Sequence, residues 1–248
     1  MAERTRRPWT RIYGTRHPQQ QNSLRLDLSL EKARKAEQRR RHTLSQRAKQ
    51  RKAIEKGSPK IKRHLYSLDA RRVFALDIEY TGLTADAEIL QVSILNGLGQ
   101  IVCNQYFRPA HVTNWDDTIP IHHITPEMVS TKPYFQTYAP QLSALFSQAE
   151  SIVGYSTMQD VGLLHKSGVA MPHKPIYVDV GEAFSYVHEA VTGQRSYAKL
   201  QDCAAYYGYG TTNWHDSLAD TKATLYCFYA LLEDPEALIR LHLLKNQM

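Results

Sequence analysis

The chain has 248 residues, with 31 Lys and Arg against 24 Asp and Glu and a formal net charge of +7 at pH 7. This length allows one good-sized domain with an appendage, and no stretch has the apolar length of a membrane span or of a signal peptide's hydrophobic region. Cys103, Cys203 and Cys227 lack metal-ligand spacing and are expected to be reduced core thiols. We therefore expect a reducing compartment: the cytoplasm, or the nucleus if the source is eukaryotic.

Positive charge is concentrated at the start of the chain. Residues 1–72 hold 22 Lys+Arg and 6 Asp+Glu, a net of +16, whereas residues 73–248 carry a net of −9. Residues 1–22 show no periodicity, which predicts disorder, and residues 29–56 are rich in helix formers. We expect residues 1–70 to form a basic, largely helical arm that binds the nucleic-acid backbone or a protein partner; the alternative is a solvated extension.

The first predicted strand runs from Val73 to Glu79 and combines an apolar run with two carboxylates, Asp77 and Glu79. Side chains at i and i+2 of a strand point to the same face, so the two carboxylates project together. Two like charges this close raise each other's pKa unless a cation neutralises them, and oxygen ligands favour Mg²⁺ or Mn²⁺ over zinc. The alternative is a strand end with two solvated acids.

Strand-forming and helix-forming stretches follow along the chain. The predicted strands after the first are residues 88–95 and 100–107, joined by the hairpin sequence Asn-Gly-Leu-Gly, then residues 151–155 and 176–179. The predicted helices are residues 126–129, 140–148, 157–166 and most of the chain after residue 181. Hairpin-connected strands followed by strands that alternate with helices predict an α/β fold with a mixed sheet covered by helices.

Asp160 is the third candidate acid. It follows a predicted strand, and Ser156 or Thr157 can cap a helix that holds Asp160 in its first turn. An acid at this position also suits the helix dipole, so it needs no catalytic role. Asp179 ends the last predicted strand; we expect it either to support the metal-binding residues or to cap a helix, and it is the substitute if Asp160 has no role.

His215 and Asp220 are the last candidates. Asp216 or Ser217 can cap a helix that holds Asp220, which leaves His215 on the loop before this helix. A single histidine at a helix start is usually an ordinary surface residue. This segment alone therefore does not distinguish a catalytic histidine from a surface one.

Taken together, these segments resemble the three motifs of the DEDDh 3′–5′ exonucleases, which include polymerase proofreading subunits and oligoribonucleases. The matching residues are Asp77-Ile78-Glu79-Tyr80-Thr81-Gly82-Leu83, then Asp160, then His215 with Asp220. A fourth stretch, Ile121-His122-His123-Ile124-Thr125, is similar to the family's Ile-His-Gly-Ile-Thr. The resemblance covers residues 73–232 and implies a ribonuclease H-like exonuclease domain over residues 71–248.

The chain departs from the family pattern at four positions. Ser156 and Gln159 stand where the family commonly has Asn and Phe, and His123 and Tyr80 stand where Gly and Thr are frequent. None of these changes replaces a motif carboxylate or the motif histidine. They concern the shape of the substrate pocket rather than the reaction.

The resemblance implies phosphodiester hydrolysis with two divalent ions, Mg²⁺ or Mn²⁺, about 4 Å apart. Asp77 would bridge both ions. Glu79 and Asp220 would hold the ion that activates water, and Asp160 would hold the ion beside the leaving oxygen. His215 would accept the proton of the attacking water, which suits a side chain whose ordinary pKa is near 6.5.

Two segments are expected to bind the terminal nucleotide. Backbone amides for its 3′-hydroxyl are expected from Thr81, Gly82 and Leu83. Its sugar or base is expected to contact His122, Ile124 and Thr125.

We therefore expect a metal-dependent 3′–5′ exonuclease that releases nucleoside 5′-monophosphates from the 3′ ends of nucleic acid. DNA is favoured over RNA, because an oligoribonuclease acts on very short strands and would have little need of a basic arm. The alternatives are an exoribonuclease or oligoribonuclease, and a non-catalytic nucleic-acid-binding or polymerase-accessory protein.

Overall fold

A computed structural model describes residues 62–171, 175–210 and 213–238, together with scattered positions between residues 31 and 60. The chain divides into two compact units, residues 1–52 and residues 53–248. No helix in the described part of the chain combines the length and the apolar character needed to cross a membrane.

In the first unit, every described residue is helical and exposed. Lys35 pairs with Glu31 at 2.6 Å and Arg41 pairs with Glu37 at 3.1 Å, each across one helical turn. The described positions of the arm are thus helical, and the extent of the arm stays a prediction. The disorder expected for residues 1–22 lies outside the described residues.

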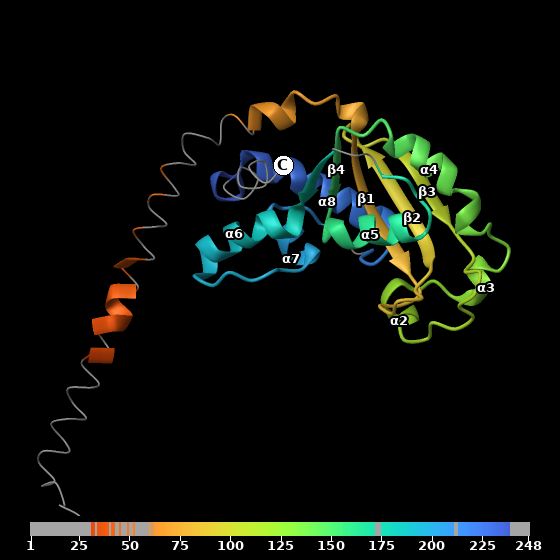
Figure 1. Cartoon of the computed structure of the whole chain (residues 1–248), viewed down its shortest axis with the longest axis horizontal. Coiled ribbons are helices and arrows are strands. Elements are labelled where there is room, and N and C mark those ends of the chain that lie inside the picture. The colour runs from red at the N-terminus through yellow and green to blue at the C-terminus, as the bar shows by residue number, and fades with distance from the viewer. Residues whose placement is uncertain are drawn as a thin grey trace, which may run out of the picture. The chain divides into compact units, whose positions relative to one another are not determined.

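A five-stranded mixed sheet forms the centre of the second unit (Figure 1). Its strands are β1 (Val73–Tyr80), β2 (Ile89–Asn96), β3 (Ile101–Tyr106), β4 (Ser151–Gly154) and β5 (Ile176–Asp179). They lie in the order β3-β2-β1-β4-β5, with β1 to β3 antiparallel and β4 and β5 parallel to β1. The mixed sheet expected from the sequence is confirmed, and the carboxyl ends of β1, β4 and β5 point the same way.

Helices pack on the sheet and carry much of the functional site. The α-helices are α2 (Ile119–His122), α3 (Pro126–Val129), α4 (Ala139–Phe146), α5 (Thr157–Lys166), α6 (Val180–Thr192), α7 (Leu200–Tyr206) and α8 (Ser217–Glu233). Two short 3-10 helices are η1 (Ala70–Arg72) and η2 (Phe135–Thr137). The helices predicted from the sequence are confirmed, and α2 is an additional one.

Two apolar layers, one on each face of the sheet, fix the direction of every side chain on β1. Ala75 belongs to the core cluster that includes α6, α7 and α8, whereas Phe74 and Leu76 belong to the cluster that includes α4 and α5. Because side chains alternate along a strand, Asp77 and Glu79 share the side of Ala75 and face α8. The core thus determines where the two carboxylates point.

Of the three helix caps expected from the sequence, two form the expected side-chain hydrogen bond. Asp216 caps α8 and Asp179 caps α6, each accepting a backbone N–H, at 3.0 and 2.9 Å. Ser156 is the N-cap residue of α5, as expected, but its side chain makes no capping hydrogen bond. Ser156 occupies the N-cap in a left-handed conformation (φ 65°), and its hydroxyl hydrogen-bonds the hydroxyl of Tyr197 at 2.9 Å instead.

The folded second unit begins before residue 70. Leu65 is buried in the core beneath α8, and Tyr66 donates a hydrogen bond from its hydroxyl to Glu233 at 2.8 Å. Lys62 also pairs with Glu233. The sequence pattern assigns these residues to the arm, because a short helix with one buried leucine has the same local composition as the arm.

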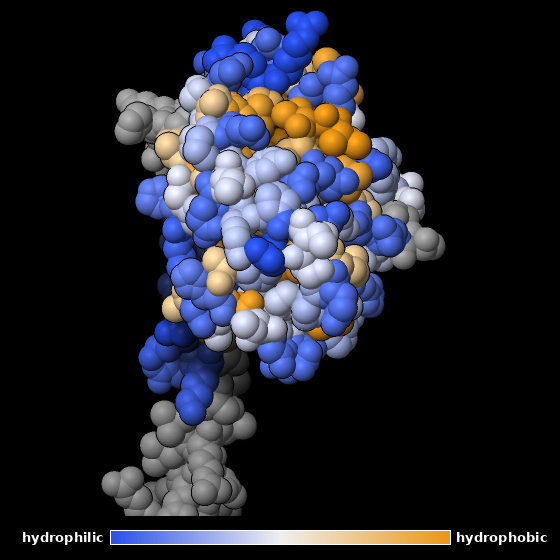
Figure 2. All heavy atoms as spheres, turned by 90° about the vertical axis from the view of Figure 1, so that its right-hand side faces the viewer, coloured by the Kyte–Doolittle hydropathy of each residue, from blue (hydrophilic) through white to orange (hydrophobic). Residues whose placement is uncertain are grey.

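The surface and the thiols agree with a folded domain. Figure 2 shows one face of the molecule, where hydrophilic residues predominate and an apolar patch lies near the upper edge.

All three cysteines are free; Cys203 and Cys227 are buried and Cys103 is half-buried. Burial raises the pKa of the Cys103 thiol to about 11.

Candidate active site

A cavity of about 300 Å³ lies where β1 ends, and we call it the carboxylate cavity. Its lining comes from β1, from α2, from the start of α5 and from the loop and helix around His215. The lining residues that the sequence singled out as functional are Asp77, Glu79, Leu83, His122, Asp160, His215 and Asp220. The structure therefore brings together all four motif carboxylates and the motif histidine.

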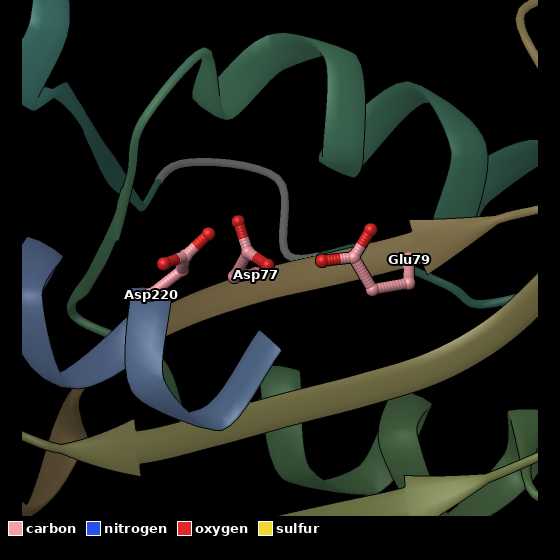
Figure 3. Close-up of side chains that lie close together, drawn as sticks. All are labelled: Asp77, Glu79 and Asp220. Atoms are coloured by element: carbon pink, nitrogen blue, oxygen red, sulfur yellow. The ribbon is translucent and has the colours of Figure 1, made fainter. Parts of the chain in front are cut away.

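Three of the carboxylates form a tight group. Asp77, Glu79 and Asp220 each offer one oxygen, and these oxygens all lie within 4.8 Å of one another. Figure 3 shows Asp77 and Glu79 projecting from the same side of β1, with Asp220 reaching the same space from α8. This spacing and the all-oxygen donor set fit a hard divalent cation.

Asp160 joins this group from the first turn of α5, where it is buried. Within the described part of the chain, Oδ2 of Asp160 and Oδ1 of Asp220 are buried and have no hydrogen-bond partner. An unsatisfied buried polar atom costs about 1–3 kcal/mol, and a charged one costs more. Both side chains therefore require a proton or a cation.

The carboxyl pKa values are all raised. Burial, and then the charge of Asp220, holds the pKa of Asp77 well above its usual range; burial and then Asp77 do the same for Asp160. Burial and then Asp77 raise the pKa of Glu79 to about 10, and burial raises that of Asp220 to about 6. Cations that bind the ionised carboxylates would displace these protons.

His215 lines the same cavity from an exposed loop position. Its backbone is left-handed, with φ 64°, a conformation that costs an L-residue roughly 1–2 kcal/mol. Its N–H donates to Oδ2 of Asp220 at 3.2 Å, and its Nε2 lies 3.5 Å from Nε2 of Gln201. The loop conformation thus places the imidazole beside the carboxylates.

His122 presents a hydrogen-bond donor to the cavity. Its side chain is buried, and its Nδ1 accepts the backbone N–H of Ile124 at 3.0 Å. The neutral ring therefore carries its proton on Nε2, which has no partner among the described residues. Burial lowers the pKa of His122, which keeps the ring neutral.

Four residues expected to bind substrate lie outside the carboxylate cavity. Thr81 is buried and accepts the N–H of Glu88 at 3.0 Å, and Ile124 lies in a small core cluster. Thr125 caps α3, and Gly82 lines a neighbouring cavity. Their contact with substrate stays a prediction.

The cavity also contains residues to which the sequence gave no role in binding or catalysis. Thr118 and Tyr155 were not singled out, whereas Tyr80 and Gln159 are departures from the family pattern and Ile121 belongs to the fourth matching stretch. Thr118 and Ile121 are placed by α2, whose start carries a proline in the first turn. For Thr118, that proline is the local signal that could have placed it on this wall.

A mixed five-stranded sheet covered by helices, with a buried acidic cavity at the end of its central strand, is the ribonuclease H-like arrangement that we expected from the sequence. The model of the RNase_T family, described as exonuclease, matches residues 74–228. Because this is more than half of the chain, the protein belongs to the RNase_T exonuclease family. The expected resemblance to exonucleases is confirmed, and the protein is a nuclease hydrolase.

Individual relatives agree with this assignment. An uncharacterized exonuclease, CP81, of Escherichia phage 186 is 27% identical over 176 residues, which cover 64% of this chain and 86% of the relative. Among solved structures, the RNase domain of yeast Pop2 gives a TM-score of 0.51 at 12% identity, covering 74% of this chain and 84% of that one. At such low identity, the likeness shows the fold alone.

The Pan2 proteins are further structural neighbours. The Saccharomyces cerevisiae Pan2 pseudoubiquitin hydrolase–RNA exonuclease module in complex with AAGGAA RNA gives a TM-score of 0.52 at 15% identity over 71% of this chain. The Neurospora crassa Pan2 catalytic unit gives 0.51 at 18% identity over 66% of this chain. This chain spans only 32% and 27% of those chains, so the likeness concerns one domain of each.

Proposed function

We propose that the protein is a 3′–5′ exonuclease that uses two divalent ions, Mg²⁺ or Mn²⁺, and releases nucleoside 5′-monophosphates from the 3′ ends of DNA. The observation that carries this proposal is the convergence of four carboxylates with raised pKa values in one cavity. A neighbour of similar fold, S. pombe Pop2p, is described as a Mg²⁺ and Mn²⁺ bound form, with a TM-score of 0.50 and 12% identity.

The carboxylates divide into two overlapping sets. Asp77, Glu79 and Asp220, whose oxygens lie within 4.8 Å, would hold one ion. Asp160, whose buried Oδ2 has no partner in the described structure, would hold the second ion together with Asp77. When bound, such ions activate water and stabilise the charge that develops on the phosphoryl oxygens.

His215 would act as the general base. Its ring lines the cavity that contains the carboxylates, and its exposure lets the accepted proton pass to solvent. The N–H bond to Asp220 couples the position of the base to that of a metal-binding side chain. A base that is fixed in this way can accept a proton from a water molecule positioned by the same carboxylates.

DNA is the proposed substrate because the second unit is acidic and depends on the basic first unit to attract a long polyanion. RNA is the second candidate, since the Pan2 neighbour is described in complex with AAGGAA RNA. A non-catalytic nucleic-acid-binding or accessory protein is less well supported, because it would not need four carboxylates and a histidine in one cavity.

The test uses the full chain and 5′-labelled strands of one sequence, as single-stranded DNA, duplex DNA and RNA, with Mg²⁺, Mn²⁺ or EDTA. We expect DNA to shorten from its 3′ end in single-nucleotide steps, faster than RNA, with no cleavage in EDTA. A 3′-phosphorylated strand should resist. Cutting of closed circles would contradict an exonuclease, faster digestion of RNA would reverse the substrate assignment, and full activity in EDTA would exclude the metal.

A further inference from the structure

Tyr197 lies between α6 and α7 and is bonded to residues at the edge of the carboxylate cavity. Its hydroxyl donates a hydrogen bond to Oδ1 of Asp179 at 3.0 Å. A hydroxyl group has one proton, so the oxygen of Tyr197 accepts its second hydrogen bond, from the hydroxyl of Ser156 at 2.9 Å. Ser156, Tyr197 and Asp179 thus form a row of hydrogen bonds that ends on a carboxylate, and we call it the Tyr197 network.

The ring of Tyr197 rests directly on the backbone of α6. A Cβ added at Gly181, in the first turn of α6, would lie 2.4 Å from Cζ and from the hydroxyl oxygen of Tyr197. The ring also packs edge to face on Tyr155, with 5.6 Å between the ring centroids. The hydroxyl of Tyr155 donates in turn to the backbone carbonyl of Ala198 at 2.6 Å. Two adjacent residues, 155 and 156, are therefore bonded to two adjacent residues, 197 and 198.

Ser156 is the point where this network reaches the start of α5. It is the N-cap residue of α5, and its backbone is left-handed, with φ 65°. Among L-residues, asparagine and aspartate adopt this conformation most readily, and serine has no such tolerance. The side chain of Ser156 makes no capping hydrogen bond, so its bond to Tyr197 is the side-chain interaction that supports this backbone shape.

Asp160 depends on the same helix start. It lies in the first turn of α5, four residues after Ser156, and both residues line the carboxylate cavity. The next residue, Thr157, donates from its hydroxyl to the backbone carbonyl of Val178 on β5 at 2.8 Å. The first turn of α5 is thus held at two consecutive residues, which fixes its rotation and with it the direction of the buried Asp160 carboxylate.

We propose that Tyr197 is a positioning residue for the metal site: through the Tyr197 network it determines where α5 holds Asp160. This inference rests on the proposed function, in which Asp160 would bind the second ion together with Asp77. Tyr197 itself does not line the carboxylate cavity. Its loss should weaken the second ion and spare the first, whose carboxylates lie on β1 and α8.

Tyr197→Phe tests this role, because it removes the hydroxyl and keeps the ring. Tyr207→Phe is the matched control: the hydroxyl of Tyr207 also donates to an aspartate, Asp234, at 2.9 Å, and Tyr207 does not line the cavity. Mn²⁺ binding to the full chain, measured from the electron paramagnetic resonance of the free ion, should show two sites in the wild type and in the control. In Tyr197→Phe one site should lose about tenfold in affinity, as when an outer partner of a metal ligand is removed. The other site should change less than about twofold.

A double variant tests whether the effect passes through Asp160. In an Asp160→Asn background, Tyr197→Phe should cause no further loss of Mn²⁺ affinity, because the carboxylate that it positions is already gone. In cleavage assays, Tyr197→Phe should raise the Mg²⁺ concentration for half-maximal rate about tenfold, and Tyr207→Phe should not.

The outcomes separate this inference from the proposed function. Wild-type affinity at both Mn²⁺ sites in Tyr197→Phe, or an equal loss in Tyr207→Phe, would overturn the positioning role and leave the exonuclease assignment intact. If the wild type binds two ions but cleaves no strand, the proposed function fails, and the Mn²⁺ affinities still decide the role of Tyr197. Fewer than two Mn²⁺ ions on the wild type would overturn both.

Discussion

The backbone N–H of His215 donates a hydrogen bond to Oδ2 of Asp220, with 3.2 Å between N and O. This bond joins the proposed base to a proposed metal-binding carboxylate across the start of α8. It also accompanies a left-handed backbone at His215, with φ 64°. The replacement that tests the base should therefore preserve the left-handed turn.

His215→Asn is that replacement, since asparagine adopts the left-handed region more readily than most residues. It removes the imidazole, so we expect the cleavage rate at saturating substrate to fall about a hundred- to ten-thousand-fold. Binding of metal and of the product nucleotide should be unchanged. A rate close to that of the wild type would exclude His215 as the base.

Asp77→Asn should abolish hydrolysis, because Asp77 is the carboxylate proposed to contact both ions. The same change removes a buried acid whose pKa is raised by burial and by Asp220. In EDTA the variant should therefore be more stable to unfolding than the wild type, by about 1–3 kcal/mol. The exposed Asp117→Asn serves as the control and should alter neither quantity.

The stability of the metal-free protein should fall as pH rises. Glu79 and Asp220 have native pKa values of about 10 and about 6, above their ordinary values of 4.5 and 3.8, so the native state binds more protons across pH 4–10. Where the native state holds the extra protons, the free energy of unfolding decreases as pH rises through the window. The melting temperature in EDTA, measured from pH 5 to pH 9, should therefore decrease.

Added Mg²⁺ should reverse part of that loss, because it binds the ionised carboxylates. Its stabilising effect should be small at pH 5 and large at pH 8. Metal-free stability that increases from pH 5 to pH 9, or an equal Mg²⁺ effect at both pH values, would contradict the role given to these carboxylates.

Local sequence patterns were sufficient to identify the carboxylates as site residues and to predict that Asp77 and Glu79 project from one face of a strand. The i, i+2 spacing of Asp77 and Glu79 in a predicted strand was enough to place both on one face, whereas the two cores that separate Ala75 from Phe74 and Leu76 are known only from the structure. The Asp216 cap likewise depends only on neighbouring residues. Such features need no long-range information.

Two departures from the family pattern were visible but not interpretable without the backbone. His123 and Ser156 stand where the family has Gly and Asn, and both adopt left-handed conformations, φ 58° and 65°. Gly and Asn are the residues that tolerate this conformation best, so the positions demand a backbone shape and not a chemical group. The bond from Ser156 to Tyr197 joins residues 41 apart, which no local pattern predicts.

His122 provides a prediction with an internal control. In His122→Asn, the amide oxygen can still accept the N–H of Ile124, but the donor at Nε2 is lost. We expect kcat/KM on strands to fall about ten- to a hundredfold, as for a lost hydrogen bond to a charged or polar group. The melting temperature should stay near that of the wild type.

His122→Gln tests the donor rather than the acceptor of the histidine ring, because the amide N–H of glutamine can reach toward the position of Nε2. It should retain more activity than His122→Asn while losing some stability. Because burial lowers the pKa of His122 from its ordinary value of 6.5, the ring is neutral above pH 7.5, and the effect of His122→Asn should be equal at pH 7.5 and pH 8.5. Full activity in His122→Asn would mean that the donor faces no substrate.

The last prediction concerns the basic arm, and the structure decides where to cut it. Leu65 and Tyr66 are part of the folded second unit, so deletion of residues 1–70 would damage that unit. Deletion of residues 1–52 removes 16 Lys+Arg and 4 Asp+Glu, a net of +12, and leaves that packing intact. Binding by counterion release predicts weaker affinity for long strands and a flatter dependence on salt, with hydrolysis of a dinucleotide nearly unchanged. If affinity for long strands and its salt slope survive the deletion, the arm instead serves a protein partner.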